Sequence, residues 1–258
     1  MKKAILWALL VGVVQVGLSP LPGWAQEKPD ADEIMRKVDE YIVPKDLTAE
    51  MTMNLIDRKG QVRQRMVRTF RMGDDKQIMW FLQPADVKGS SFLRLSYDDR
   101  DDDMWLYLPA FGKVRRIASH AKNGNFMGTD FTYEDLGDRK LKDYDYRWLK
   151  DETIGDKGCW VIESAPRKGI STDFARIVSW IWKDEPIAVQ EEFYDASGTL
   201  RKKSARELTR IKSYWVPAKV TMHDLKLDHR TEMIFDKMTV DTGLSEKIFD
   251  SGSLTRIY

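Results

Sequence analysis

The stretch LTAEMTMNLIDRKGQVRQRMVRTFRM, residues 47–72, determines the architecture because its apolar side chains return at every second position. Met51, Met53 and Leu55 alternate with polar residues, a period typical of a strand with one buried face. Asp57-Arg58-Lys59-Gly60 has the composition of a tight turn. The return stretch, residues 61–72, places one apolar face on Val62, Met66, Phe70 and Met72. These residues therefore predict an antiparallel hairpin.

The same period continues on both sides of the irregular stretch 109–138, which is rich in glycine and phenylalanine. We expect about eleven strands in antiparallel order, preceded by one helix over residues 31–41. Helices and strands do not alternate along the chain, which argues against a parallel α/β fold. The pattern favours a mainly β protein built as a curved sheet or open barrel. A long irregular stretch inside such a domain is often functional.

The N-terminus has the three parts of a secretory signal peptide, predicted over residues 1–25. Lys2 and Lys3 precede an apolar run, and Gly23 and Ala25 fit a cleavage site. The residue directly after the predicted cut is Gln26 and not a cysteine, so we expect an exported chain that is not lipid-anchored. Residues 26–258 then form a single domain. Loss of the two lysines changes the formal net charge from +1 to −1, which gives no support for nucleic-acid binding.

Residues suited to catalysis or metal binding do not form a recognisable pattern. The acidic run Asp98–Asp103 lacks calcium-loop spacing, and a solvated turn is the favoured interpretation. The single cysteine, Cys159, lies in an apolar strand, and the chain has no G-x-S-x-G elbow. We therefore expect no enzyme activity, metal or cofactor. A hydrolase would require His120 to cluster with Asp130 and Glu134.

Three further stretches resemble a known family. They are MWLYLPAFGKVRRI at 104–117, NFMGTDFTYEDL at 125–136 and PADVKGSSFLRL at 84–95. Together they are similar to the outer membrane lipoprotein-sorting protein family, a LolA-like group. The resemblance implies an incomplete antiparallel β-barrel of about eleven strands, with helices covering an apolar cavity, as in the LolA/LolB fold.

The function implied by the resemblance is that of a soluble periplasmic carrier. It would hold the acyl chains of a lipoprotein, or a free hydrophobic lipid, and shuttle them toward the outer membrane. A possible partner is an inner-membrane exporter of the resistance-nodulation-division (RND) type, with transient contacts to membrane proteins. The alternative is a periplasmic adaptor or scaffold of an envelope transport complex that carries no cargo.

The carrier hypothesis predicts an apolar binding surface and a lid over it. The expected cavity residues all lie on predicted strands: Met51, Met53, Leu55, Met66, Phe70, Trp80, Leu82, Leu95 and Trp105. The expected lid residues lie in the irregular stretch: Phe111, Phe126, Met127 and Phe131. Alternation alone does not fix which face of each strand points inward.

Overall fold

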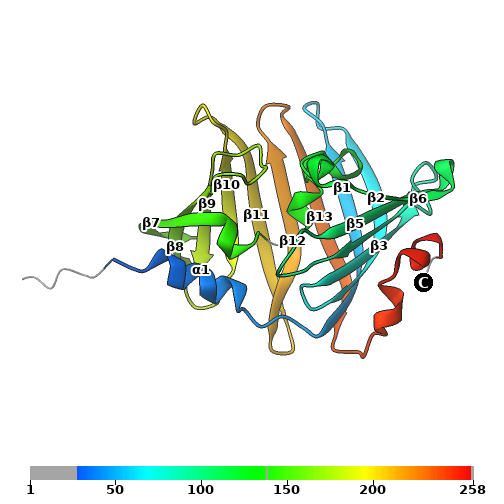
Figure 1. Ribbon diagram of the computed structural model, residues 1–258, viewed down its shortest axis with the longest axis horizontal. Coiled ribbons are helices and arrows are strands. Elements are labelled where there is room, and N and C mark those ends of the chain that lie inside the picture. Colours follow the sequence, from blue (N-terminus) through cyan, green and yellow to red (C-terminus); the bar gives the residue numbers. More distant parts are fainter. Residues whose placement is uncertain (1–27, 138, 257–258) are drawn as a thin grey trace, which may run out of the picture.

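The computed structural model describes residues 28–137 and 139–256, so the predicted signal peptide lies outside the described residues. Within these ranges, no helix has the length and apolar character needed to cross a membrane. Figure 1 shows one large sheet with α1 (Ala31–Asp39) running across one side of it.

The sheet is formed by thirteen strands. Their bounds are β1 Asp46–Ile56, β2 Val62–Met72, β3 Lys76–Gln83, β4 Ser91–Leu95, β5 Asp103–Leu108, β6 Lys113–Arg116, β7 Tyr144–Ile154, β8 Lys157–Pro166, β9 Arg176–Trp182, β10 Ala188–Tyr194, β11 Leu200–Ile211, β12 Tyr214–Asp224 and β13 His229–Val240. Short 3-10 helices lie between and after these strands. Their bounds are η1 Pro109–Phe111, η2 Ser119–Ala121, η3 Phe126–Gly128, η4 Glu134–Leu136, η5 Leu141–Asp143, η6 Glu246–Ile248 and η7 Ser251–Thr255.

The helix α1 begins where the sequence predicts. Asp30 is its N-cap, and its carboxylate accepts hydrogen bonds from the backbone N–H groups of Asp32 and Glu33. Such a cap satisfies donors that the first turn leaves unpaired. The buried side of the helix, Ala31 and Ile34, packs on β8 and β9.

The strands follow the order β6-β5-β4-β3-β2-β1-β13-β12-β11-β10-β9-β8-β7, and every described pairing is antiparallel. The first and last strands of this order are not paired to each other, so the barrel is incomplete, as expected. The expected count of about eleven strands was wrong. One strand that the alternation did not reveal is β6, which lies inside the irregular stretch and is only four residues long.

The sheet curls strongly around its contents. Met104 on β5 and Ile177 on β9 belong to one apolar cluster. These strands are second and eleventh in the order, and members of the same cluster lie on most of the strands between them. Figure 1 shows the sheet curved across these strands. We call this side the inner face; it carries Met53, Phe92 and Ile162.

The inner face is covered by two segments. The helix α1 covers its β7–β9 side. Residues 119–136, here called the lid segment, cover the β1–β5 side with Phe126 and Phe131. The second part of the irregular stretch therefore lies over the sheet, whereas its first part contains the sheet strand β6.

The outer face is apolar over β3–β5 and has its own cover. Ile78, Trp80 and Leu93 pack there against Phe249 and Leu254. These last two residues belong to the C-terminal strap, residues 244–256, which crosses the face beside β3 and β5 (Figure 1). The Ser91 hydroxyl donates to the Leu254 carbonyl at 2.6 Å and fixes the end of the strap.

The strap contributes to stability through these two buried side chains. We expect Phe249→Ala and Leu254→Ala each to lower the free energy of unfolding by about 2–5 kcal/mol, the usual cost of emptying a packed site. Leu227→Ala is the control, because this side chain is 57% exposed and its loss changes stability by less than about 0.5 kcal/mol. Urea denaturation monitored by tryptophan fluorescence measures the free energy of unfolding of each variant. Equal stability of all three variants would contradict a role for the strap.

Candidate functional site

The lid segment inserts an aromatic plug into the inner face. Phe126 is completely buried, with its ring 5.1 Å from Phe92, 5.5 Å from Tyr133 and 6.1 Å from Phe81. The contacts with Phe92 and Tyr133 are edge-to-face, the favoured geometry for aromatic pairs. The aromatic side chains of the lid segment therefore fill the apolar space above the inner face of the sheet.

A tight loop carries the plug. The backbone pairs Asn125 with Thr132, and Phe126 N–H donates to the Phe131 carbonyl at 2.7 Å. At the tip, Met127 and Gly128 both adopt left-handed backbone angles, with φ of 50° and 75°. Glycine adopts this region freely, whereas methionine does so at a cost of about 1–3 kcal/mol. The surrounding contacts therefore hold Met127 in a strained conformation.

One of these contacts comes from Arg65 on β2. Its Nη1 donates to the Met127 carbonyl at 2.7 Å, and its guanidinium carbon lies 5.9 Å from the centre of the Phe81 ring. The side chain is 4% exposed, and its Nε has no hydrogen-bond partner among the described residues. No described carboxylate lies within ion-pair distance of it either. Burial, with a contribution from nearby Arg63, lowers the pKa of Arg65 from its usual value.

Asp130, just beyond the tip, is the most tightly held lid residue. Its carboxylate accepts from the Thr231 hydroxyl at 2.7 Å and lies 2.8 Å from His229 Nδ1. Its N–H donates back to Thr231 Oγ1 at 3.0 Å, and Lys202 Nζ donates to its carbonyl at 2.6 Å. Asp130, Thr231 and Lys202 are all buried. The tip is thus fixed by polar groups from β11 and β13.

A buried ion cluster follows the lid segment along the chain. Glu191 on β10 bonds to Arg139 and Arg206 and accepts from the Ser179 hydroxyl at 3.2 Å. Burial alone would raise the pKa of Glu191, but the two arginines outweigh burial and lower it. This cluster attaches the chain just after the lid to the far half of the sheet.

The predicted cavity residues divide between the two faces. Met51, Met53 and Leu55 lie buried on the inner face beneath the lid. The others lie on the outer face: Met66, Phe70, Trp80, Leu82, Leu95 and Trp105. The expectation that all of them share one inward face is therefore wrong. The reason is the β1–β2 register, in which Met53 pairs with Arg65 and Thr52 pairs with Met66. Paired residues share a face of the sheet, so Met66 lies on the side opposite to Met53.

The predicted lid residues also divide. Phe126 and Phe131 are buried and Met127 packs on the same cluster. Phe111 is 57% exposed on the β5–β6 connection, where Arg115 stacks 4.9 Å from its ring centre. It does not contribute to the plug. Whether any of these residues contacts a ligand stays a prediction.

Sequence reasoning missed the polar groups of the inner face: Arg65, Lys202, His229 and Thr231. A usable signal existed for Arg65. The Asp57 N–H bonds to Gln61 O across the turn, which pairs odd-numbered residues of β1 with odd-numbered residues of β2. Turn geometry fixes hairpin register. The turn therefore places Arg65 on the same face of the sheet as Met53.

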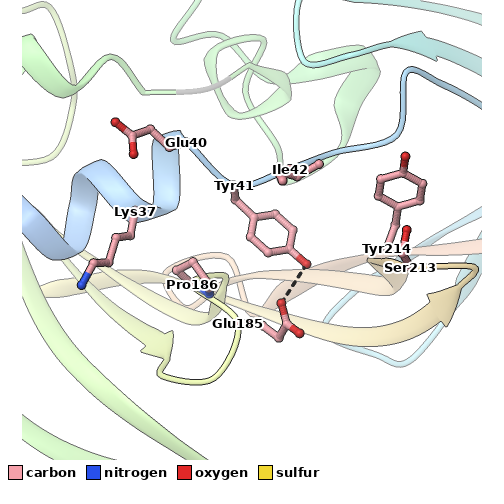
Figure 2. A pocket seen from close by; sticks show the side chains of 8 residues that line it. All are labelled: Lys37, Glu40, Tyr41, Ile42, Glu185, Pro186, Ser213 and Tyr214. Atoms are coloured by element: carbon pink, nitrogen blue, oxygen red, sulfur yellow. Dashed lines mark hydrogen bonds between the residues drawn. The ribbon is translucent and has the colours of Figure 1, made fainter.

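A separate surface pocket of about 450 Å³ lies between the α1–β1 connection and the turns after β9 and β11. Figure 2 shows the side chains that line it. Glu185 accepts there from the Tyr41 hydroxyl and from Trp215 Nε1, each at 3.2 Å. Burial, then the Glu185 charge, raises the pKa of Tyr41. The pocket is open and contains none of the predicted site residues.

The hydrolase and metal alternatives each depend on a particular cluster of residues. Asp130 pairs with His229 and not with His120, which is exposed, so the cluster that a hydrolase would need is not formed. No group of three or more potential metal ligands occurs within residues 28–137 and 139–256. In the acidic run, Asp102 pairs with Arg94 and Asp103 with Arg100 and Arg116, which fits a charged turn.

Comparison with known proteins identifies related chains. A family model described as that of an uncharacterized protein matches residues 73–256. A solved protein from Vibrio parahaemolyticus, named for an outer membrane lipoprotein-sorting domain, is 31% identical, with a TM-score of 0.80 over 88% of this chain and 98% of its own. A DUF1329 family protein from Desulfovibrio piger is 29% identical, with a TM-score of 0.80 over 86% and 97%.

A more distant match extends the likeness in fold alone. A LolA superfamily protein from Nitrosomonas europaea is 20% identical, with a TM-score of 0.66 over 86% of this chain and 98% of its own. No curated protein matches the chain.

The plug predicts a local response to truncation. We expect Phe126→Ala to lower the free energy of unfolding by about 3 kcal/mol and to speed amide hydrogen exchange across residues 119–136. Phe111→Ala, on the exposed connection, is the matched control and leaves both unchanged. Exchange that stays slow in Phe126→Ala would show that the lid is held without its plug.

The acidic run predicts a pH effect. Hydrogen bonds from Arg100 and Arg116 lower the pKa of Asp103 from 3.8 to about 2. The ionised form is favoured in the folded state, so this stability is present above pH 4 and is lost as pH falls toward 2. After allowance for solvent screening, Asp103→Asn costs about 1 kcal/mol at pH 7 and almost nothing at pH 2. Asp99→Asn, an exposed neighbour, is the control in urea denaturation at both pH values.

Proposed function

Because the chain belongs to the outer membrane lipoprotein-sorting protein family, we propose that it is a periplasmic carrier of acyl chains whose lid segment is exchanged for cargo. The supporting observation is the plug: Phe126 and Phe131 occupy an apolar inner face, yet they sit on a loop and not on the sheet. Polar bonds to Arg65 and Asp130 hold that loop. Carriage would be passive, without a catalytic step.

The free energy gained by burying the two phenyl side chains of the lid is comparable to the free energy gained by burying part of an acyl chain. Two buried phenyl side chains contribute about 3–6 kcal/mol to lid closure. An acyl chain contributes about 0.8 kcal/mol for each buried CH₂, so roughly four to eight CH₂ groups match the plug. A long lipid chain therefore displaces the lid with free energy in reserve, while a short one does not. Release to an acceptor then recloses the lid and recovers part of that energy.

The strained tip favours exchange. Met127 releases its left-handed strain when the loop leaves, which lowers the cost of opening. The bonds of Asp130 act in the opposite direction and keep the empty protein closed. Such a balance gives two states separated by a few kcal/mol, as a ligand-driven switch requires.

The proposed cellular location and partners rest on the family and on the predicted signal peptide. We infer export to the periplasm, cleavage near residue 25 and transient contact with a membrane donor and acceptor. A donor of the RND exporter type stays a prediction, and so does the choice between a lipoprotein and a free lipid as cargo. In the adaptor alternative, the lid would remain closed and a partner protein would bind the outside.

Purification tests the carrier. Gently isolated mature protein should retain host lipid, seen in native mass spectra as an added mass and identified after solvent extraction. Phe126→Ala should retain about as much lipid or more, because the competing plug is smaller, whereas Phe111→Ala should match wild type. Protein that is lipid-free from its native host and takes up no acyl probe would reject the carrier. A constant protein partner without lipid would instead favour the adaptor.

A further inference from the structure

The inner face beneath the lid tip carries basic groups. Lys202 points to the same side as Ser204, which pairs with Met222 and through it with Thr231. Arg65 pairs with Met53, which pairs with Met233, two residues beyond Thr231. Cross-strand partners share a face. The registers therefore place Arg65, Lys202 and Thr231 together on this face, along with His229.

The closed lid satisfies this group with its own acceptors. Arg65 donates to the Met127 carbonyl, Lys202 to the Asp130 carbonyl, and Thr231 and His229 contact the Asp130 carboxylate. The lid thus presents, side by side, apolar side chains and one carboxylate. It has the chemical layout of an amphiphile with an anionic end.

Lid opening removes these acceptors. Arg65 and Lys202 are 4% and 7% exposed in the closed form, and neither has a described carboxylate within ion-pair distance. A buried cation without a partner is strongly unfavourable. In addition, Arg65 Nε has no partner even while the lid is closed. The open state therefore needs an anion at this position, and an apolar chain alone does not supply one.

We propose that the cargo is an amphiphile with an anionic head group, a phosphate or a carboxylate, and that its chains replace Phe126 and Phe131. The head group replaces the Met127 carbonyl at Arg65, and it replaces Asp130 at Lys202, Thr231 and His229. This proposal rests on the carrier function and narrows its cargo. Arginine pairs with phosphate and carboxylate through two parallel hydrogen bonds, and Arg65 has its Nε available for a second one. Uncharged lipids with the same chains offer only neutral oxygen acceptors, which do not compensate the charges of the two cations.

Transfer from vesicles tests the proposal. Phosphatidylcholine vesicles carry a small fraction of labelled phosphatidic acid or of diacylglycerol with identical chains, and the protein is separated after incubation. We expect wild type to take up phosphatidic acid at least about 10-fold better. Arg65→Gln should lose most of this preference, measured as the ratio of phosphatidic acid to diacylglycerol taken up, and Arg65→Lys should restore part of it.

The matched control is Arg63→Gln, two residues away on the same strand but exposed and paired with Asp86. It should keep the wild-type preference. Lys202→Gln provides a second variant if Arg65→Gln does not fold, and it should lose the preference in the same direction. Thermal melting and circular dichroism verify the fold of each variant.

Each remaining outcome contradicts a different statement. Equal uptake of the two lipids by wild type would overturn the anionic cargo and leave the carrier intact. Uptake of neither lipid would overturn the carrier itself. Inorganic phosphate that competes as well as phosphatidic acid would assign the site to free phosphate and overturn the amphiphile.

Discussion

A sheet that is apolar on both faces must be covered on both, and this constraint governs the rest of the molecule. The inner face is shielded by α1 and the lid segment, while the outer face over β3–β5 is shielded by the C-terminal strap. The two covers differ in how they are held. The strap is held by Phe249 and Leu254, by the Ser91 hydroxyl and, at its start, by the side chains of Asp46 and Lys76, which bond to Leu244 and Glu246. The lid tip is fixed mainly by buried polar groups of the sheet. A hydrogen bond depends on direction as well as on distance, so a small displacement of either group breaks it. The lid tip, whose polar bonds are buried, is therefore the cover suited to an abrupt release.

Much of the fold could be predicted from the sequence because its signals are local. The alternation of Met51, Met53 and Leu55 and the turn at residues 57–60 each act within a few residues. The strand β6 was missed because four residues with three basic side chains give no apolar period. The resemblance of residues 104–117 and 125–136 to a known family indicated the open barrel, and the structure confirms it.

The candidate site was less accessible because it depends on non-local facts. An apolar residue on a strand indicates only that its face is covered, and here both faces are. Met66 and Trp80 therefore resembled cavity residues although the strap side of the sheet holds them. Among the polar residues beneath the lid, Arg65 is separated by more than 100 positions from Lys202, His229 and Thr231. No sequence period joins such positions, and only the pairing registers bring them to one face.

The open barrel retains two strand edges, and their composition bears on the state in which the protein exists in solution. Unpaired edges recruit other strands and lead to aggregation, unless they are short, irregular or charged. The edge strand β6 is four residues long and carries Lys113, Arg115 and Arg116. The opposite edge, β7, is longer, but its pairing register shifts between Trp148 and Lys150 and charged residues recur along it. Both ends of the sheet are thereby protected, and a curled sheet can open and close its lid without adding strands from a neighbouring copy.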